Sequence, residues 1–299
     1  IYLVGGQTVI RLVSGEKRER LSTVESLQVA MEEDPTGYCY NSSNWKFEPP
    51  ISCLRSGVRV SALNNFLYAV GGNSGDERLR RAERLDLSGG SKEWVSIAPM
   101  HEPRSNMAMV TMGEFLYVVG GFNGSSRLQS MEKYDVHSDR WIRCADMHSA
   151  REGLGCVVVG GEIYALGGFD GTKNLRTVER YNASQDRWFE MPEKLNNPRA
   201  FFGVVLACGY LYAMGGQDDS GRFHDSCETL GPLDPPVPKG VSSQEEISSS
   251  SKPTDLLRKS SDSADDDNKL NRHIERLKWE ISERLRLPSK LCNFTLLTF

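Results

Sequence analysis

The sequence lacks the features that would place the chain in a membrane, in an oxidising compartment or on a nucleic acid. No apolar stretch reaches the roughly 20 residues that span a bilayer, and no secretory signal opens the chain. The seven cysteines are scattered without a Cys-x-x-Cys pair, so neither a zinc ribbon nor a disulfide framework is indicated. The net charge of −4 argues against a nucleic-acid partner. We expect a reduced, cytoplasmic protein with no membrane or nucleic acid among its partners.

Catalytic and metal-binding patterns are missing as well. The five histidines show no spacing typical of metal ligands. The glycine-rich run from Gly167 to Lys173 lacks the Gly-Lys-Ser/Thr of a phosphate-binding loop and precedes an expected strand. We therefore expect no enzyme, no catalytic residue, no metal site and no cofactor.

What the sequence does contain is a repeat with a period near fifty residues. Gly-Gly pairs begin at Gly5, Gly71, Gly120, Gly167 and Gly215. Single tryptophans lie between them, 49, 47 and 47 residues apart, at Trp45, Trp94, Trp141 and Trp188. An arginine stands 16 residues before four of the pairs, at Arg55, Arg104, Arg151 and Arg199. Three registers that hold together over several copies indicate one supersecondary unit stacked on copies of itself.

One repeat, from Arg104 to Cys144, reads as four short strands. Ser105–Val110 and the apolar run Phe115–Val119 supply the first two, and Gln129–Asp135 and Arg140–Arg143 supply the others. Connections this short favour an antiparallel meander, and four strands per repeat in radial repetition describe a propeller blade. We expect the spaced arginines to brace neighbouring loops and the tryptophans to pack between blades.

These repeats resemble kelch repeats, most closely those of the kelch-like family of ubiquitin-ligase substrate adaptors. The resemblance rests on the Gly-Gly pairs, the motif Glu132-Lys133-Tyr134-Asp135, the spaced tryptophans and the stretch from Pro99-Met100 to Arg104. It covers roughly residues 1–229, although Leu27 and Leu85 replace the motif tyrosine in two repeats.

The resemblance implies a protein-interaction module, the substrate-recognition propeller of a cullin-RING ubiquitin ligase. Cullin binding would then need BTB and BACK domains, which are absent from this chain. The alternative is a cytoskeletal (actin-binding) or scaffolding kelch protein. A kelch-propeller enzyme, such as a sugar epimerase or a copper oxidase, is a third and less favoured class.

The expected fold is therefore all-β, a kelch propeller of four-stranded antiparallel blades with about five repeats in residues 1–229. A disordered linker rich in Ser, Pro and Asp follows at 230–268, then an amphipathic helix at 269–287 and an apolar tail at 288–299. The helix is predicted from one apolar face, which consists of Leu270, Ile274, Leu277, Ile281 and Leu285.

The two end repeats each lack an expected strand. The propeller therefore resembles a fragment or a splice product, unless the end groups share one blade. The tail resembles no family. Docking on a partner, self-association and translated intronic sequence all remain open for it.

The candidate binding residues follow from strand direction. Because direction alternates in a meander, the loop after Gly-Gly and the joint to the next repeat share one end of the propeller, and the resemblance implies that this end binds substrate. Directly after the glycine pairs come Gln7, Asn73, Phe122, Phe169 and Gln217. Six positions after the second glycine come Arg78, Arg127, Asn174 and Arg222. Directly after the spaced arginines, at family positions that point into the channel mouth, come Ser56, Ser105, Glu152 and Ala200.

Charge suggests the kind of partner. Three arginines among four equivalent positions suit an acidic motif, because guanidinium pairs with carboxylate in a bidentate manner; ordinary solvated loop charges are the alternative. Glu152 and Ala200 stand where the family commonly has serine, which argues against a recognition mode shared with the family.

The first repeat carries two insertions. One adds basic residues to the binding face, at Arg11, Lys17, Arg18 and Arg20. The other, between Glu25 and Trp45, is expected to be a disordered spacer.

Overall fold

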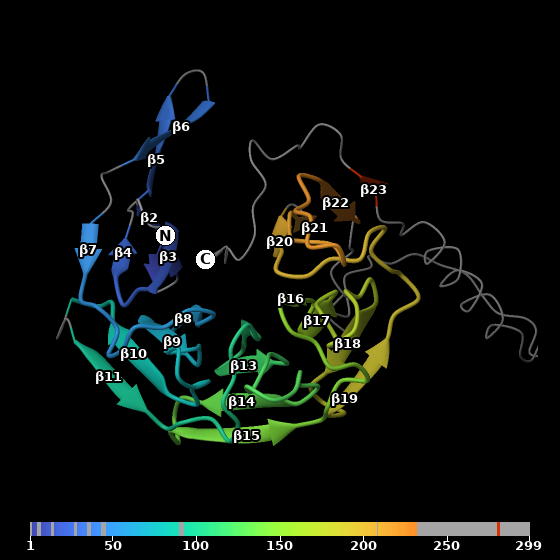
Figure 1. Cartoon of the computed structure of the whole chain (residues 1–299), viewed down its shortest axis with the longest axis horizontal. Helices are drawn as coiled ribbons and strands as arrows, with labels where there is room; N and C mark the ends of the chain where they lie inside the picture. Colours follow the sequence, from blue (N-terminus) through green and yellow to red (C-terminus); the bar gives the residue numbers. More distant parts are fainter. Residues whose placement is uncertain are drawn as a thin grey trace, which may run out of the picture.

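The computed structural model describes residues 2–4, 7–12, 15–26, 29–34, 37–42, 46–89, 93–207, 209–231 and 280–281. Within these residues the chain forms strands and turns and no helix. One three-stranded sheet and four four-stranded antiparallel sheets follow one another around a common axis (Figure 1). The predicted all-β propeller of four-stranded antiparallel blades is confirmed.

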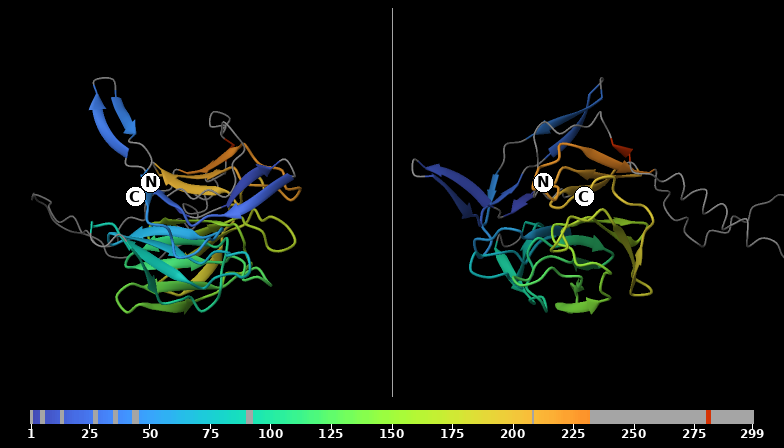
Figure 2. Two further views of the ribbon diagram at one scale, coloured as in Figure 1. Left: turned by 60° about the vertical axis from the view of Figure 1, so that its left-hand side comes forward. Right: turned by 45° about the vertical axis from the view of Figure 1, so that its right-hand side comes forward.

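Three blades are built from consecutive strands. The first of them contains β8 (Arg59–Leu63), β9 (Phe66–Val70), β10 (Ala82–Asp86) and β11 (Trp94–Ile97). The next contains β12 (Ala108–Met112), β13 (Phe115–Val119), β14 (Met131–Asp135) and β15 (Arg140–Cys144). The third contains β16 (Gly155–Val159), β17 (Glu162–Leu166), β18 (Val178–Asn182) and β19 (Arg187–Glu190). Each blade is a meander whose first strand lies innermost and whose last strand lies at the outside of the ring (Figure 1). Figure 2 shows the same sheets from two further directions.

Turn residues explain why the strands fold back so sharply. β8 and β9 are joined by Asn64 and Asn65, whose φ angles are 50° and 60°. Gly160 and Gly161 occupy the same turn between β16 and β17. Two consecutive residues with positive φ form the tight hairpin whose twist matches that of paired strands, and Asn and Gly tolerate this conformation best.

The first sheet is formed by β1 (Tyr2–Val4), β4 (Val24–Ser26) and β7 (Lys46–Glu48). Its two insertions form separate hairpins, β2 (Gln7–Leu12) with β3 (Gly15–Arg20) and β5 (Val29–Asp34) with β6 (Gly37–Ser42). The second hairpin projects away from the ring (Figure 1). The prediction of a disordered spacer is wrong for these strands, which pair on either side of a Pro-Thr-Gly sequence that favours a turn.

The last blade contains β20 (Gly203–Ala207), β21 (Tyr210–Met214), β22 (Cys227–Leu230) and β23 (Glu280–Ile281). β23 comes from the C-terminal part of the chain and pairs antiparallel with β22. The predicted helix is therefore wrong at these two residues. Pairing with β22 satisfies backbone groups that the open edge of that strand would leave free. The linker was predicted to begin at 230, but Leu230 is the last residue of β22, so the prediction is wrong at that residue. The remaining parts of the predicted C-terminal region lie outside the described residues: 232–268 of the linker, the rest of 269–287, and the tail at 288–299.

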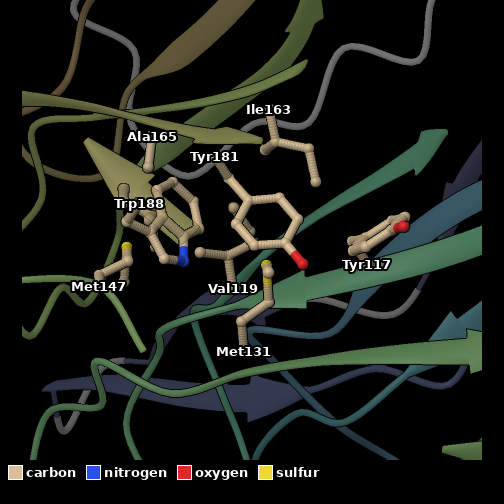
Figure 3. Close-up of a cluster of buried hydrophobic side chains, with 10 residues drawn as sticks. Tyr117, Val119, Met131, Met147, Ile163, Ala165, Tyr181 and Trp188 are labelled. Carbon is tan, nitrogen blue, oxygen red and sulfur yellow. The ribbon is translucent and has the colours of Figure 1, made fainter. Parts of the chain in front are cut away.

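The core lies between the blades. Trp188 packs with Tyr181, Met147 and Ile163 against Tyr117, Val119 and Met131 of the preceding blade (Figure 3). The Trp188 indole also donates its Nε1 hydrogen to the carbonyl of Ala145, at 3.0 Å. Trp94 and Trp141 make the equivalent bonds to Pro49 and Ala98. The predicted inter-blade role is confirmed for these three tryptophans, and Trp45 lies outside the described residues.

The spaced arginines are buried braces, as predicted. Arg104 donates from Nη1 to the carbonyls of Gly120 and Ser130, both at 2.9 Å, and from Nη2 to Glu132 at 3.0 Å. Arg55, Arg151 and Arg199 pair in the same way with Glu83, Glu179 and Glu228. All four arginines are fully buried.

Two of these carboxylates, those of Glu132 and Glu179, have a lowered pKa. Burial favours a raised pKa for Glu132, but the backbone hydrogen bond from His101 and the charge of Arg104 outweigh it, so that its pKa is lowered. The pKa of Glu179 is lowered in the same way, against burial, chiefly by Arg151 and the amide of His148. Each ion pair therefore connects the segment that leads into the first strand of a blade with the third strand of the same blade.

Candidate functional site

The predicted binding residues gather at one end of the propeller, which we call the Gly-Gly face. Within each blade the residue after the glycine pair lies between two partners and forms a β-bridge with each. The three complete blades give the sets Ser56–Asn73–Arg78, Ser105–Phe122–Arg127 and Glu152–Phe169–Asn174. In one of them Ser105 and Phe122 exchange two backbone hydrogen bonds, at 3.0 and 2.9 Å. Three separate sequence registers therefore meet as one short ladder in each blade.

Side chains on this face stack from one blade to the next. The Arg78 guanidinium lies over the ring of Phe122 in the following blade, with Cζ 5.0 Å from the ring centroid. Arg127 covers the same ring at 4.7 Å and reaches the ring of Phe169 in the blade after that, at 4.9 Å. Alternating cations and aromatic rings thus cross three blades, and each such contact stabilises by about 0.5–2 kcal/mol.

The two stacked arginines differ in their charge partners. Arg127 donates from Nε to Glu152 at 3.0 Å, and Asn106 donates to the other oxygen of that carboxylate at 2.9 Å. Arg78 makes no ion pair within the described residues, and its Nε is buried without a hydrogen-bond partner there. The charge of Arg127 is thus balanced by the Glu152 carboxylate of the same chain. The guanidinium of Arg78 is instead held over the ring of Phe122 and remains available to bind an anion.

The last blade departs from the predicted register. Here the residue that bridges Gln217 is Phe223, not Arg222, because the loop is one residue longer than in the other blades. Arg222 is 77% exposed and faces Asp218 of its own loop, with Nε and Oδ2 3.5 Å apart. A hydrogen bond from the Ser220 hydroxyl, with help from Arg222, lowers the pKa of Asp218 to about 2. Arg222 therefore does not hold the position that Arg78 and Arg127 hold in their blades, and the predicted register is wrong for this loop.

Asn174 holds the stacked position in its blade without a charge. Its side-chain amide donates to the carbonyl of Gln217 at 3.1 Å, and its backbone amide donates to Asp219. It therefore ties its own loop to the next blade. Gln7 begins β2, and the basic residues Arg11, Lys17, Arg18 and Arg20 lie on β2 and β3; their side chains are outside the description.

A chain of three backbone hydrogen bonds links four successive blades just before their first strands, a feature that the spacing of the repeats did not predict. Asn106 donates to the carbonyl of Gly57, Gly153 to that of Asn106 and Phe201 to that of Gly153, at 3.0, 2.8 and 2.7 Å. All four residues have φ between 54° and 64°. Gly and Asn in this conformation could have been recognised two positions after each spaced arginine. Phe201 could not, because a bulky residue rarely adopts it.

The phenylalanine rings on the Gly-Gly face differ in what they contact. The rings of Phe122 and Phe169 carry arginines on their faces. Phe201 packs its ring onto Gly153, where even a Cβ atom would come within 2.7 Å of it. Phe223 is 39% exposed. The face therefore offers aromatic surface together with the guanidinium of Arg78, which has no charge partner among the described residues.

Within the described residues, no group of three or more His, Cys, Asp or Glu side chains could hold a metal ion. Over the same part of the chain, no helix has the length and apolar character to cross a membrane.

The sequence profile of the KLHDC2/KLHL20/DRC7 Kelch-repeats domain matches residues 1–216. The chain belongs to this kelch-repeat family. Among the 308 matching chains of solved structures, that of YjhT has a TM-score of 0.52 at 17% sequence identity, and the match covers 58% of this chain and 60% of that chain. At this identity the likeness shows the fold alone. A comparison with curated proteins found no match.

Kelch propellers are typically protein-interaction modules, and the Gly-Gly face of this one has the features such modules need. Its loops are anchored by buried Arg–Glu pairs, so that exposed side chains sit on a rigid frame. Guanidinium stacked on an aromatic ring keeps its in-plane N–H groups available for a carboxylate. The face can therefore hold an acidic group beside an apolar one.

Proposed function

We propose that this kelch propeller recognises a segment of another protein on its Gly-Gly face, and that it does so as the substrate-recognition part of a cullin-RING ubiquitin ligase in the cytoplasm. The observation that carries the binding part is the contrast between the two stacked arginines. Arg127 already has the Glu152 carboxylate, whereas Arg78 has a ring beneath it and no carboxylate among the described residues.

The proposed partner segment carries an aspartate, a glutamate or a terminal carboxylate that pairs with Arg78. A neighbouring apolar side chain would lie on the rings of Phe122 and Phe169. The remaining predicted contacts on the same ladder, Asn73 and Ser56, offer polar groups at the edge of this site. A buried guanidinium–carboxylate pair of this kind is strong, and truncating one partner costs about 2–5 kcal/mol of binding.

The test is affinity capture from a cytosolic extract with the full chain, its Arg78→Glu variant and its Arg140→Glu variant. Arg140 begins β15 at the opposite end of the blade and is exposed, so it is the matched charge reversal. Proteins retained by the wild type and by Arg140→Glu but lost with Arg78→Glu are the expected partners. Equal losses with both variants would contradict binding at the Gly-Gly face.

The ligase role is tested separately, in cells that express the protein. Depleting an adaptor should raise the abundance of the captured partner, because its ubiquitination falls. An unchanged abundance with altered localisation of the partner would favour the cytoskeletal or scaffolding alternative.

A further inference from the structure

We propose that Glu152 is an internal carboxylate that occupies the anion site of Arg127, and that it thereby limits the Gly-Gly face to segments with a single acidic contact, at Arg78. A second acidic side chain brought to Arg127 meets the charge of Glu152 and is rejected. The inference rests on the proposed function, because it specifies which acidic segments the same face accepts. Glu152 then determines specificity by repulsion and does not attract the partner.

Both oxygens of the Glu152 carboxylate are bound by the preceding blade. Arg127 donates from Nε to Oε2 at 3.0 Å, and Asn106 donates from Nδ2 to Oε1 at 2.9 Å. The side chain of Glu152 is 9% exposed, and that of Arg127 is 31% exposed. A carboxylate held at both oxygens keeps its position, and salt screens a charge so shielded from water only weakly.

Arg78 lacks such a carboxylate because its counterpart of Glu152 is a serine. Glu152 bridges the residue after the glycine pair in the blade that follows Arg127. In the blade that follows Arg78, the residue at this position is Ser105. Its hydroxyl is uncharged and donates to the carbonyl of Phe122 at 3.4 Å. One difference in residue type at equivalent positions therefore distinguishes the two arginines.

The residue that orients Glu152 also differs from its counterparts. Asn106 has a φ angle of 54° at a position where two other blades have Gly57 and Gly153. Asparagine tolerates this left-handed conformation better than most residues, and unlike glycine it adds a side-chain amide. That amide is the donor to Glu152. The carboxylate and the group that orients it thus occur together in one contact between blades.

The two arginines are close enough for one short segment to reach both. Their Cζ atoms, in Arg78 and Arg127, lie 5.0 and 4.7 Å from the centroid of the same Phe122 ring. Alternate side chains of an extended segment are about 7 Å apart. A segment with acidic residues at alternate positions therefore suits both guanidinium groups in geometry, and the charge of Glu152 excludes it. Placing a like charge against the wrong partner is a general route to specificity.

The test is an array of peptides with one fixed aspartate and, two positions away on either side, either aspartate or asparagine. The wild-type chain should prefer asparagine at the variable position. Glu152→Gln keeps the size of the side chain and removes its charge, so this variant should bind the doubly acidic peptides about tenfold more tightly than the wild type does. The gain should disappear when Arg127→Met is added, because it requires the released guanidinium.

The matched control is Glu162→Gln. Glu162 pairs with Arg180, which is as exposed as Arg127, but it begins β17 at the end of the blade opposite the glycine pair. This variant should keep the wild-type preference. An equal gain in Glu162→Gln, no gain in Glu152→Gln, or a gain that survives Arg127→Met would overturn the inference. Glu152→Ser, which introduces the residue type of the preceding blade, is the second variant for the same measurement should Glu152→Gln fail to fold.

The same array distinguishes failure of this inference from failure of the proposed function. If the wild type bound no acidic peptide, the proposed role of Arg78 would be wrong. Glu152→Gln should still acquire binding of singly acidic peptides through Arg127, and the absence of that gain would overturn the inference as well.

Discussion

Replacement of Arg151 by methionine should be far more damaging than loss of a peripheral arginine. The guanidinium is fully buried and donates to the carbonyls of Gly167 and Thr177, to the Thr177 hydroxyl and to Glu179. Methionine fills much of the volume but satisfies none of these acceptors. It also leaves the Glu179 carboxylate, which is 1% exposed, without a guanidinium partner. Among the described residues, its remaining partners are then the backbone amides of His148 and Ser149 and the His148 ring.

Removing one partner of a buried ion pair costs about 3–5 kcal/mol. For a domain of this size, 1 kcal/mol lowers the thermal midpoint by about 2–4 °C, so Arg151→Met should lower it by about 6–20 °C. Circular dichroism or calorimetry on the full chain measures the shift. The double variant Arg151→Met, Glu179→Leu should recover part of it, because no charge is then left buried alone.

The control is Arg180→Met. Arg180 pairs with Glu162 at 2.6 Å, and the two side chains are 31% and 21% exposed. A pair this accessible to water contributes about 0–1 kcal/mol. If Arg180→Met and Arg151→Met lowered the midpoint equally, the buried pairs would not be the braces of the blades.

Two further predictions concern packing and pH. Trp188→Ala should destabilise the propeller by about 3–5 kcal/mol, because it leaves a cavity between two blades; chemical denaturation measures this, and a loss below about 1 kcal/mol would contradict the inter-blade assignment. The lowered pKa of Glu132 means that its contribution to stability is present above the ordinary glutamate pKa and is lost as pH falls from there through the lowered folded value. Stability measured between pH 7 and pH 3 should therefore fall less steeply in Glu132→Gln than in the wild type, and identical slopes would show that Glu132 does not carry the acid sensitivity.

The sequence was sufficient to predict the blades because their determinants recur. Each spaced arginine donates to the carbonyl of the glycine 16 residues later. The constant spacing in the sequence therefore reflects a hydrogen bond that every blade needs. The tryptophans recur for the same reason, since every blade must pack against its neighbour. A feature that the fold needs in each copy becomes visible as a repeated spacing.

The binding face was predicted less fully because its details differ between copies. The positions of Asn73, Phe122 and Phe169 followed from the meander, but the one-residue insertion that replaces Arg222 by Phe223 is not a repeated feature. The hydrogen bond between Arg127 and Glu152 joins neighbouring blades across 25 residues. It could not be predicted from the sequence, because this pair of residues does not recur at the same spacing in the other repeats. The strand at Glu280–Ile281 was hidden because its apolar residues also fit a helical period.

The central claim is that Arg78 makes the Gly-Gly face a receptor for an acidic segment, and an array of peptides with and without acidic residues tests it most directly. The wild-type chain should bind peptides enriched in aspartate or glutamate. Arg78→Glu should weaken that binding by about 30-fold or more, which corresponds to the roughly 2 kcal/mol or more expected of a buried charge pair. Arg222→Glu and Arg140→Glu should leave it nearly unchanged. Absence of acidic enrichment, or equal losses in the three variants, would contradict the claim.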